Sequence, residues 1–582
     1  MVSKPVETGP PMSDFDIEMA SITLPHTRSS RPDENTTWKV FTDVSDYIKL
    51  VTEANEANER ERNMTLREAI KMYYMAIGWS VLASLGVIMI GYSSEVLGAC
   101  FAIPSFRNKY GSVTPEGFRE ISQDWQKGIS AAGTVGTVIG LQIASPISER
   151  FGYRWTIISL ALTTMILSFI PIFSENLPAF LTGYLLQGIT FGIYPVIVAY
   201  ASEVCPTVLR HILIAFSFIF LVVGQFLASG VISAFSGRLD EGGYKSILML
   251  QWIWPVPISI AMYLAPESPW WCVQKGQLDC ANESLKRLAR KSSQPYINGK
   301  LALMIYVDSV EKRATKGATY LDCFRGTNIR RTELVCAASV TGAICSAPLG
   351  GLTTSLYSKA GILFWVQAHV GLGVSIFALV ITLTTWVILN RIGRKSLLLG
   401  GMCVIVTILL IAGFLGVPKH LSNSASIVTG SVLMVLPVVG NIITPVIYTI
   451  VAEVPSTRLR IKSIALARSA YHIINAAFVQ TITEKQLDTG GWDWGLKSCL
   501  FWAGMSLIFA TYIYLRLPET KGRTYAELNV MFENKIAARK FASTEVGPLR
   551  INNGNDQENL AIHIANTSAF EYQTRDIITM TT

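Results

Sequence analysis

Long apolar segments alternate with short polar stretches through most of this chain, and the apolar segments are long enough to cross a bilayer as helices. The hydrocarbon core of a bilayer requires about 20 mainly apolar residues per helix. The pattern predicts an all-α membrane protein with six helices, a polar loop and six further helices. The twelve predicted spans are 75–98, 128–148, 155–173, 178–201, 212–235, 246–264, 332–356, 363–389, 397–416, 426–451, 463–482 and 495–515.

Polar stretches divide the chain into five parts. Residues 1–45 and 545–582 lack the apolar pattern needed to bury a core, so we expect weak order there. No long apolar run precedes residue 74, so the first span is expected to act as the insertion signal. The predicted parts are an N-terminal tail 1–70, a six-helix bundle 71–265, a central loop 266–331, a second six-helix bundle 332–517 and a C-terminal tail 518–582.

One short set of charged residues occurs twice, in the same order, at the ends of apolar segments. The two sets are separated by roughly 240 to 250 residues, which indicates a tandem parallel repeat. The first set is Arg150, Glu203, Arg210 and Glu267, and the second is Arg391, Arg394, Glu453, Arg460 and Glu519.

These charges form a candidate inner gate. Ion pairs at the helix ends can form when two bundles approach and break when they part, which is the two-state element that alternating access needs. The alternative is that each charge only anchors a helix end and fixes topology. Occurrence of the whole set in both halves favours the gate.

Charge distribution predicts the orientation. Lys and Arg are concentrated in the central loop and in the other loops on its side, so the positive-inside rule places that loop and both termini in the cytoplasm. The net charge of +8 is thereby explained by cytoplasmic flanks, and no nucleic-acid partner is expected. We expect a monomer in the plasma membrane, with the lipid bilayer and a small-molecule substrate as its partners and protons as a candidate partner.

Composition argues against an enzyme. Half of the residues are apolar and 15% are charged, which excludes an ordinary soluble enzyme or a disordered scaffold. No nucleophile-base pair or phosphate-binding loop is present. Of the nine cysteines, Cys272, Cys280 and Cys323 fall in the central loop without metal-ligand spacing, so no metal or other cofactor is predicted.

Motifs at the helix ends carry a family resemblance. Pro-Glu-Ser at 266–268 and Pro-Glu-Thr at 518–520 occupy equivalent places in the two halves. Together with 200–206 and 449–453, they make residues 60–545 resemble a sugar porter of the major facilitator superfamily, most closely the fungal maltose and α-glucoside permeases. The resemblance implies twelve transmembrane helices in two pseudo-symmetric bundles, with the substrate path between them.

Polar residues on the predicted spans are candidates for sugar binding. Amide and hydroxyl side chains beside aromatic surface can hydrogen-bond sugar hydroxyls in a cavity. The alternative is that each of them satisfies a neighbouring helix, and His472 is predicted to be such a packed residue. The candidate substrate contacts are Gln225, Gln367, Asn441, Tyr448 and Asn475.

The seventh predicted span departs from the maltose permeases. Where they usually carry a cavity-facing Gln this chain has Gly342, and Leu352 and Ser355 stand where two tyrosines are expected. Each missing hydrogen-bond partner typically costs about 1–3 kcal/mol. Several such losses together are expected to weaken the binding of ordinary maltose.

The first predicted span lacks the acids associated with proton coupling. The resemblance implies an acid at position 93, where this chain has Ser93, and Glu95 is the nearest acid. An intramembrane Arg needs a partner, so Glu95 and Arg468 are coupling candidates. Backbone carbonyls or an anionic substrate are alternative partners for Arg468.

Two classes of function remain on this basis. The first is a carrier of a sugar, α-glucoside-like or similar, or of another small metabolite, imported or exported. The second is a sensor that keeps the fold and signals through its cytoplasmic parts. A sensor is expected to have a long C-terminal tail, and the tail here has only about 65 residues, which favours a carrier.

Overall fold

A computed structural model describes residues 44–541 of the chain, except 102, 114–118, 236–237, 239, 290–291, 315–318, 346–363, 390, 417–422, 488–491, 493 and 524. Almost all of the described chain is helical. In that part, ten helical segments are long and apolar enough to cross a membrane. They match ten of the twelve predicted spans, and they are Tyr74–Cys100, Gln123–Phe151, Tyr153–Ile172, Leu177–Glu203, Val208–Phe235, Glu241–Leu264, Val370–Leu389, Arg394–Leu415, Ile427–Glu453 and Gly495–Arg516.

The other two predicted spans are helical as well. Span 332–356 begins within α17 (Asn328–Cys345), and its remainder lies outside the described residues. Span 463–482 is formed by α22 (Arg460–Ile474), the π-helical turn η3 (Asn475–Gln480) and the start of α23 (Thr481–Leu487). Charged residues at the start of α22 lower its apolar character.

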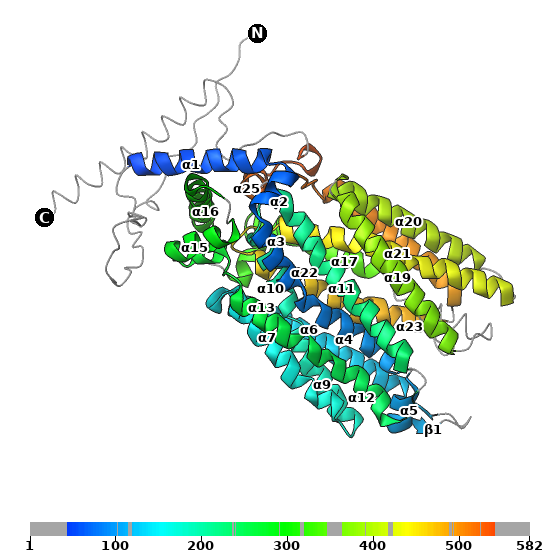
Figure 1. Cartoon of the computed structure of the whole chain (residues 1–582). Coiled ribbons are helices and arrows are strands. Elements are labelled where there is room, and N and C mark those ends of the chain that lie inside the picture. The colour runs from blue at the N-terminus through cyan, green and yellow to red at the C-terminus, as the bar shows by residue number, and fades with distance from the viewer. Residues whose placement is uncertain are drawn as a thin grey trace, which may run out of the picture.

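Two bundles of helices lie side by side (Figure 1). The first contains α3 (Tyr74–Ser84), α4 (Gly86–Cys100), α6 (Gln123–Phe151), α7 (Tyr153–Leu167), α8 (Phe169–Ile172), α9 (Leu177–Thr190), α10 (Ile193–Glu203), α11 (Thr207–Phe235), α12 (Glu241–Met249), η1 (Leu250–Ile253) and α13 (Pro255–Leu264). The second contains α17, α22, η3 and α23 with α19 (Phe364–Leu389), α20 (Arg394–Leu415), α21 (Asn423–Glu453), η4 (Gly495–Lys497) and α24 (Ser498–Arg516).

The two most extensive helix contacts, α6 with α9 and α11 with α4, lie within the first bundle. In the first bundle α6 packs on α9 through glycines: a Cβ atom at Gly136 or Gly140 would overlap the backbone of α9. Small residues of this kind allow membrane helices to approach closely. Between the bundles, α11 lies against α19 and α21, and α6 and α10 lie against α22. We call this boundary the seam.

Short helices cover one end of both bundles, which we call the capped end (Figure 1). They are α1 (Val44–Asn63), α2 (Leu66–Met72), α14 (Pro269–Gln274), α15 (Leu278–Leu288), α16 (Gln294–Ala314), η2 (Tyr320–Phe324), α25 (Tyr525–Glu533) and η5 (Ala538–Lys540). Buried Lys300 on α16 forms an ion pair with buried Glu61 on α1. The segments predicted as tails and central loop thus contain packed helices. The opposite end carries α5 (Pro104–Tyr110) and the short hairpin of β1 (Ser112–Val113) and β2 (Arg119–Glu120).

Candidate functional site

The repeated motifs form two matching structures at the capped end. Glu267 accepts hydrogen bonds from the first two backbone N–H groups of α7, at 3.0 and 3.3 Å. Glu519 accepts from the first two N–H groups of α20, at 2.9 and 3.1 Å. A carboxylate is favourable at a helix N-terminus, where unpaired N–H groups point outward. Burial nevertheless raises the pKa of Glu267 to about 7.

Glycine is required where each carboxylate approaches its loop. A Cβ atom at Gly152 would overlap the carboxylate of Glu267, and a Cβ atom at Gly393 would overlap that of Glu519. Gly152 also has φ of 89°, in the left-handed region that glycine adopts without strain.

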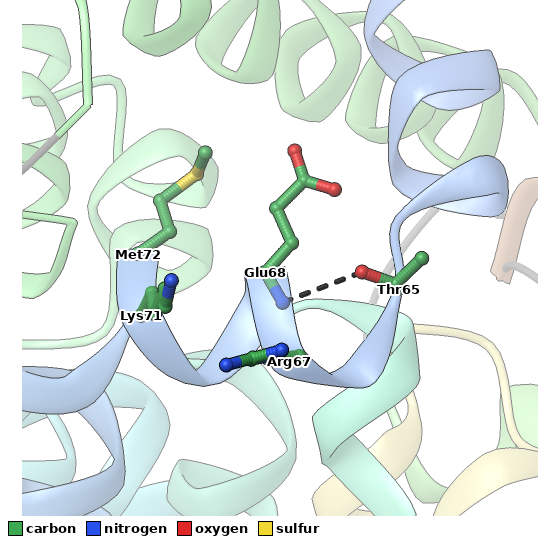
Figure 2. A pocket seen from close by; sticks show the side chains of 5 residues that line it. All are labelled: Thr65, Arg67, Glu68, Lys71 and Met72. Carbon is green, nitrogen blue, oxygen red and sulfur yellow. Dashed lines mark hydrogen bonds between the residues drawn. The ribbon is translucent and has the colours of Figure 1, made fainter.

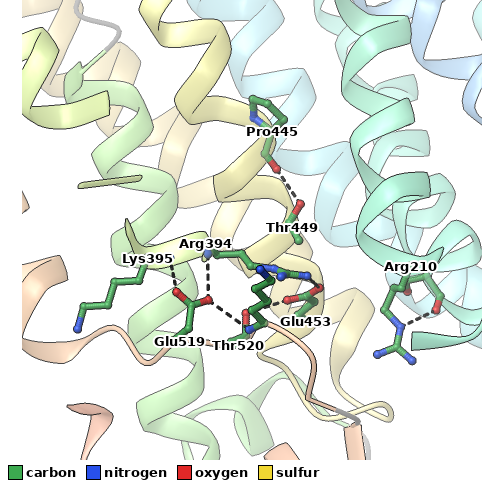
Figure 3. Close-up of polar contacts among 10 residues, drawn as sticks. Arg210, Arg394, Lys395, Pro445, Thr449, Glu453, Glu519 and Thr520 are labelled. Atoms are coloured by element: carbon green, nitrogen blue, oxygen red, sulfur yellow. Dashed lines mark hydrogen bonds and ion pairs between the residues drawn. The ribbon is translucent and has the colours of Figure 1, made fainter. Parts of the chain in front are cut away.

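A second pair of glutamates lies deeper. Each accepts a hydrogen bond from the hydroxyl of the residue that directly follows Glu267 or Glu519 in the sequence. Ser268 Oγ donates to Glu203 at 2.5 Å, and Thr520 Oγ1 donates to Glu453 at 2.8 Å. Figure 3 shows the second-half set, with Thr520 and Glu453 beside Arg394. The internal repeat therefore extends to individual hydrogen bonds.

The two halves differ in the charged partner of the deeper glutamate. Arg394 pairs with Glu453 at 3.3 Å inside the second bundle. The equivalent residue of the first half is Tyr153, which donates its hydroxyl to Glu203 at 2.8 Å but has no charge. Glu203 instead pairs across the seam with Arg460, at 3.1 Å. Both side chains of this pair are almost completely buried, at 1% and 0% exposure.

Other predicted gate residues are divided between this cluster and the surface. Arg210 lies at the seam, where its Nε donates to the Ser202 carbonyl at 3.2 Å. Figure 3 shows it well apart from the Arg394 set. Arg150 and Arg391 are exposed and lie outside the cluster. The sequence reasoning did not separate these two groups.

Two more polar contacts close the seam near the capped end. Lys462 on α22 pairs with Glu149 on α6. About two turns further along these helices, Gln142 Nε2 donates to Ser469 Oγ at 2.7 Å. These contacts and the Glu203–Arg460 pair hold the two bundles together at this end.

The position expected to carry a proton-coupling acid belongs to a neutral network. Ser93 Oγ donates to Gln251 Oε1 at 3.1 Å, and Gln187 Nε2 lies 2.5 Å from the same oxygen and 3.3 Å from Ser93 Oγ. All three side chains are buried inside the first bundle. Gln187 and Gln251 were not among the predicted site residues, and only their polarity within apolar segments could have indicated them.

Arg468 is surrounded by aromatic rings at the seam. Its guanidinium carbon lies 5.3 Å from the ring centre of Tyr194, 4.9 Å from that of Tyr448 and 4.6 Å from that of Tyr471. Tyr194 is on the first bundle and the other residues are on the second. Cation–π contacts of this kind stabilise a partly desolvated guanidinium. Tyr448 also packs against Phe218 of α11, with the ring centres 5.4 Å apart and the planes tilted by 57°, so this predicted substrate contact lies where the bundles meet.

Glu95 lies at another depth in the membrane. Its carboxylate accepts from Ser229 Oγ at 3.2 Å, and Ser229 contacts Ser375 of the second bundle at 3.2 Å. Arg468 is eight residues beyond Arg460 on its helix, or about 12 Å, whereas Ser229 is nineteen residues beyond Arg210, or about 28 Å. Arg210 and Arg460 contact the same ring, that of Tyr525, and therefore lie at a similar depth. Glu95 and Arg468 are thus separated by about 16 Å along the bundle axis, and the structure does not bring these coupling candidates together.

The remaining substrate candidates differ in their surroundings. Asn441 Nδ2 donates to the Pro437 carbonyl of its own helix at 2.8 Å. Asn475 is half-buried and begins the π-helical turn η3, a feature often found at functional sites. Gln225 is half-buried on α11, and the side chain of Gln367 lies outside the described residues.

Tyr471 borders the position where the seventh span departs from the maltose permeases. A Cβ atom at Gly342 would lie 3.9 Å from Cε2 of Tyr471 and 3.1 Å from Cδ1 of Ile447. A larger polar side chain at 342 would therefore compete with Tyr471 for space. Leu352 and Ser355, the other departures, lie outside the described residues.

An open pocket of about 510 Å³ lies on the cap (Figure 2). Its lining comes from α2 and the residue that caps it, and none of these residues belongs to a membrane-spanning helix. We therefore do not connect it with the substrate path. The lining residues are Thr65, Arg67, Glu68, Lys71 and Met72.

Two cysteines of the cap lie together. The Sγ atoms of Cys272 on α14 and Cys280 on α15 are 2.7 Å apart, and both are free thiols. The hydrogen bond from Cys272 lowers the pKa of Cys280 to about 7 and raises that of Cys272. Within the described part of the chain, no group of three or more potential ligands is placed to hold a metal ion.

Comparison with known proteins places these features in a family. A model described as sugar (and other) transporter matches residues 79–532. The general alpha-glucoside permease of Saccharomyces cerevisiae is 36% identical over 551 residues, which cover 93% of this chain and 88% of the permease. The maltose permease MAL61 of the same organism is 36% identical over 516 residues, or 87% of this chain and 84% of the permease.

Solved transporter structures share the fold. The proton:xylose symporter XylE, a major facilitator superfamily protein bound to 6-bromo-6-deoxy-D-glucose, superimposes with a TM-score of 0.64 at 19% identity, covering 79% of this chain and 99% of XylE. The inward-open conformation of XylE from E. coli gives 0.55 at 18% identity, covering 78% and 99%. The predicted two-bundle fold is confirmed.

Proposed function

This chain belongs to the sugar transporter family and is a multi-pass membrane transporter of the major facilitator fold, and from that premise we propose that it carries an α-glucoside, or a polar solute of similar size, by alternating access. Relatives that match most of the chain are named alpha-glucoside and maltose permeases. They favour a carrier over the sensor and metabolite-exporter alternatives. The half-buried amides of Gln225 and Asn475 and the tyrosines around Arg468 are the proposed sugar contacts.

The cross-seam pair of Glu203 and Arg460 is the observation that carries the mechanism. It joins the bundles at one end only, and it is buried on both sides. At the opposite end, the polar contacts between described residues of the two bundles include the exposed pair of Lys127 and Glu484, 3.2 Å apart, and the hydroxyl contact near Glu95. An exposed pair contributes about 0.2–1 kcal/mol, so the uncapped end separates more easily.

We further propose that transport is facilitative, without a proton carried on α4. Ser93, Gln187 and Gln251 form a network of amides and a hydroxyl, none of which titrates near neutral pH. The nearest acid, Glu95, lies about 16 Å from Arg468 along the bundle axis, so proton binding at Glu95 does not act directly on the tyrosines around Arg468.

The capped end is proposed to face the cytoplasm of a plasma-membrane protein. Lys and Arg are abundant in the central loop, which forms α14 to α16 of the cap. Protease added to intact cells should then leave the cap helices uncut.

Uptake of labelled maltose tests this proposal. The host should lack its own α-glucoside carriers, and surface expression should be checked by labelling. Facilitation predicts that internal maltose approaches the external concentration and that a protonophore changes neither the initial rate nor the final ratio. Glu95→Gln should leave both quantities unchanged.

Three results would contradict parts of the proposal. Accumulation above the external concentration that a protonophore abolishes would refute facilitation but retain sugar transport. Loss of that accumulation in Glu95→Gln would assign the coupling to Glu95. Absence of uptake, and of competition by other α-glucosides, from protein present at the surface would refute the proposed substrate class.

A further inference from the structure

The ring of Tyr525 lies between two guanidinium groups at the capped end. The guanidinium carbon of Arg210 is 3.3 Å from the ring centre, and that of Arg460 is 3.9 Å from it. Two guanidinium groups this close to one centre would overlap if they shared a face, so they lie on opposite faces of the ring. The tyrosine side chain is buried, with 5% exposure.

Helix α25, which begins at Tyr525, is attached to the second bundle. Asn529 Oδ1 accepts a hydrogen bond of 2.6 Å from Arg331 of α17, and the same guanidinium lies 4.8 Å from the ring centre of Phe532. Leu528 and Met531 are buried against the main core. Tyr525 and Arg460 are therefore expected to move together with the second bundle.

The other neighbours of Tyr525 belong to the first half. Arg210 lies on α11 of the first bundle. The rings of Trp270 and Tyr525 are nearly perpendicular, at 83°, with their centres 6.3 Å apart. Trp270 is on α14, next to Ser268, whose hydroxyl bonds Glu203. Tyr525, which follows the last membrane-spanning helix, thus contacts residues on both sides of the seam.

We propose that Tyr525 is a positioning residue of the gate, an aromatic wedge that joins Arg210 to Arg460 only while the capped end is closed. Two cations would repel each other across the seam, but the negative faces of the ring attract both. When the bundles part, the ring stays with Arg460 and loses Arg210 and Trp270. The proposal rests on the alternating access proposed above.

The test measures opening at the capped end directly. Ser469→Cys supplies a reporter at the seam, because Ser469 is buried and bonded to Gln142 in the closed arrangement. Sealed vesicles that expose the capped end are treated with a membrane-impermeant methanethiosulfonate, and labelling of position 469 is followed by peptide mass spectrometry. Native cysteines then need not be removed.

Replacement at 525 changes the ring's charge distribution while preserving its shape. Tyr525→Phe keeps both faces of the ring and removes only the hydroxyl. The labelling rate at position 469 in this variant should therefore equal the rate in the protein that retains Tyr525. Fluorinated phenylalanines at 525 have nearly the same volume but progressively weaker negative faces. The rate should rise stepwise with fluorination, to about 2- to 30-fold, the factor expected for one lost cation–π contact.

The outcomes separate this inference from the proposed function. A rate that does not change with fluorination, or a Tyr525→Phe rate as high as that of the most fluorinated ring, would overturn the wedge while leaving sugar uptake unaffected. Failure of the unsubstituted protein to transport any α-glucoside would overturn the substrate proposal but not a graded response in labelling.

Discussion

Glu203→Gln separates a latch across the seam from an anchor at a helix end. The substitution keeps the shape of the side chain and an acceptor for Ser268 or Tyr153, but it removes the charge opposite Arg460. Removing one partner of a buried ion pair costs about 3–5 kcal/mol, because the other charge remains buried. Arg460 reaches water when the capped end opens, so this cost falls mainly on the closed conformation.

The expected shift toward the open conformation follows from that asymmetry. A cost of about 3–5 kcal/mol corresponds to roughly two to four orders of magnitude in the closed-to-open ratio. The stack of Arg460 on Tyr525 remains in the mutant, so we expect the lower end, about 100-fold. Labelling of the Ser469→Cys reporter should accelerate until the open form predominates, and uptake from outside should slow because closure becomes rare.

The internal repeat supplies a matched control. Glu453→Gln removes the same charge from a similarly buried site, but its partner Arg394 lies in the same bundle. The free-energy cost of leaving Arg394 unpaired is the same in the closed and open conformations. Glu453→Gln should therefore lower the melting temperature without accelerating labelling at position 469. Equal acceleration by the two variants, or none with Glu203→Gln, would refute the reasoning.

Three further changes have defined outcomes. Ser93→Asp places a carboxylate beside the Gln187 amide, so maltose uptake, measured between pH 5 and pH 8, should become pH-dependent. Gly152→Ala forces a side chain into a positive-φ position and against a carboxylate, which should destabilise the fold by about 1–3 kcal/mol and lower the melting temperature. Alkylation of Cys280 should increase as pH rises through about 7, its thiol pKa. Cys272→Ala should move that midpoint upward, because the hydrogen bond that it removes favours the thiolate.

Much of the fold could be predicted because long apolar segments identify membrane-spanning helices directly from the sequence. The bilayer requires long apolar helices, and the spans expected over 397–416 and 495–515 agree within a few residues with Arg394–Leu415 and Gly495–Arg516. The gate glutamates were predicted because the same motif occurs in both halves. A repeated charge at a helix end has few structural roles.

Partners across the seam could not be predicted in the same way. Glu453 is much nearer to Arg460 in the sequence than Glu203 is. Nothing in the sequence indicates that Arg460 pairs with Glu203, because the choice of partner depends on how the two bundles meet. Tyr525 follows the second Pro-Glu-Thr motif by only five residues, yet its contacts lie on three different elements. The separation of Glu95 from Arg468 likewise depends on how far each helix is inserted into the membrane. The pattern of apolar residues does not fix that position to within one helical turn.

A single departure from the repeat accounts for the latch. If the first half carried an arginine at 153, as the second does at 394, both deep glutamates would be neutralised within their own bundles. The closed end would then gain little from bringing Glu203 to Arg460. Because Tyr153 donates a hydrogen bond but no charge, Glu203 forms its ion pair with Arg460 of the other bundle. We propose that the asymmetry between two otherwise matching motifs turns a helix-end anchor into an interaction that depends on the closed conformation.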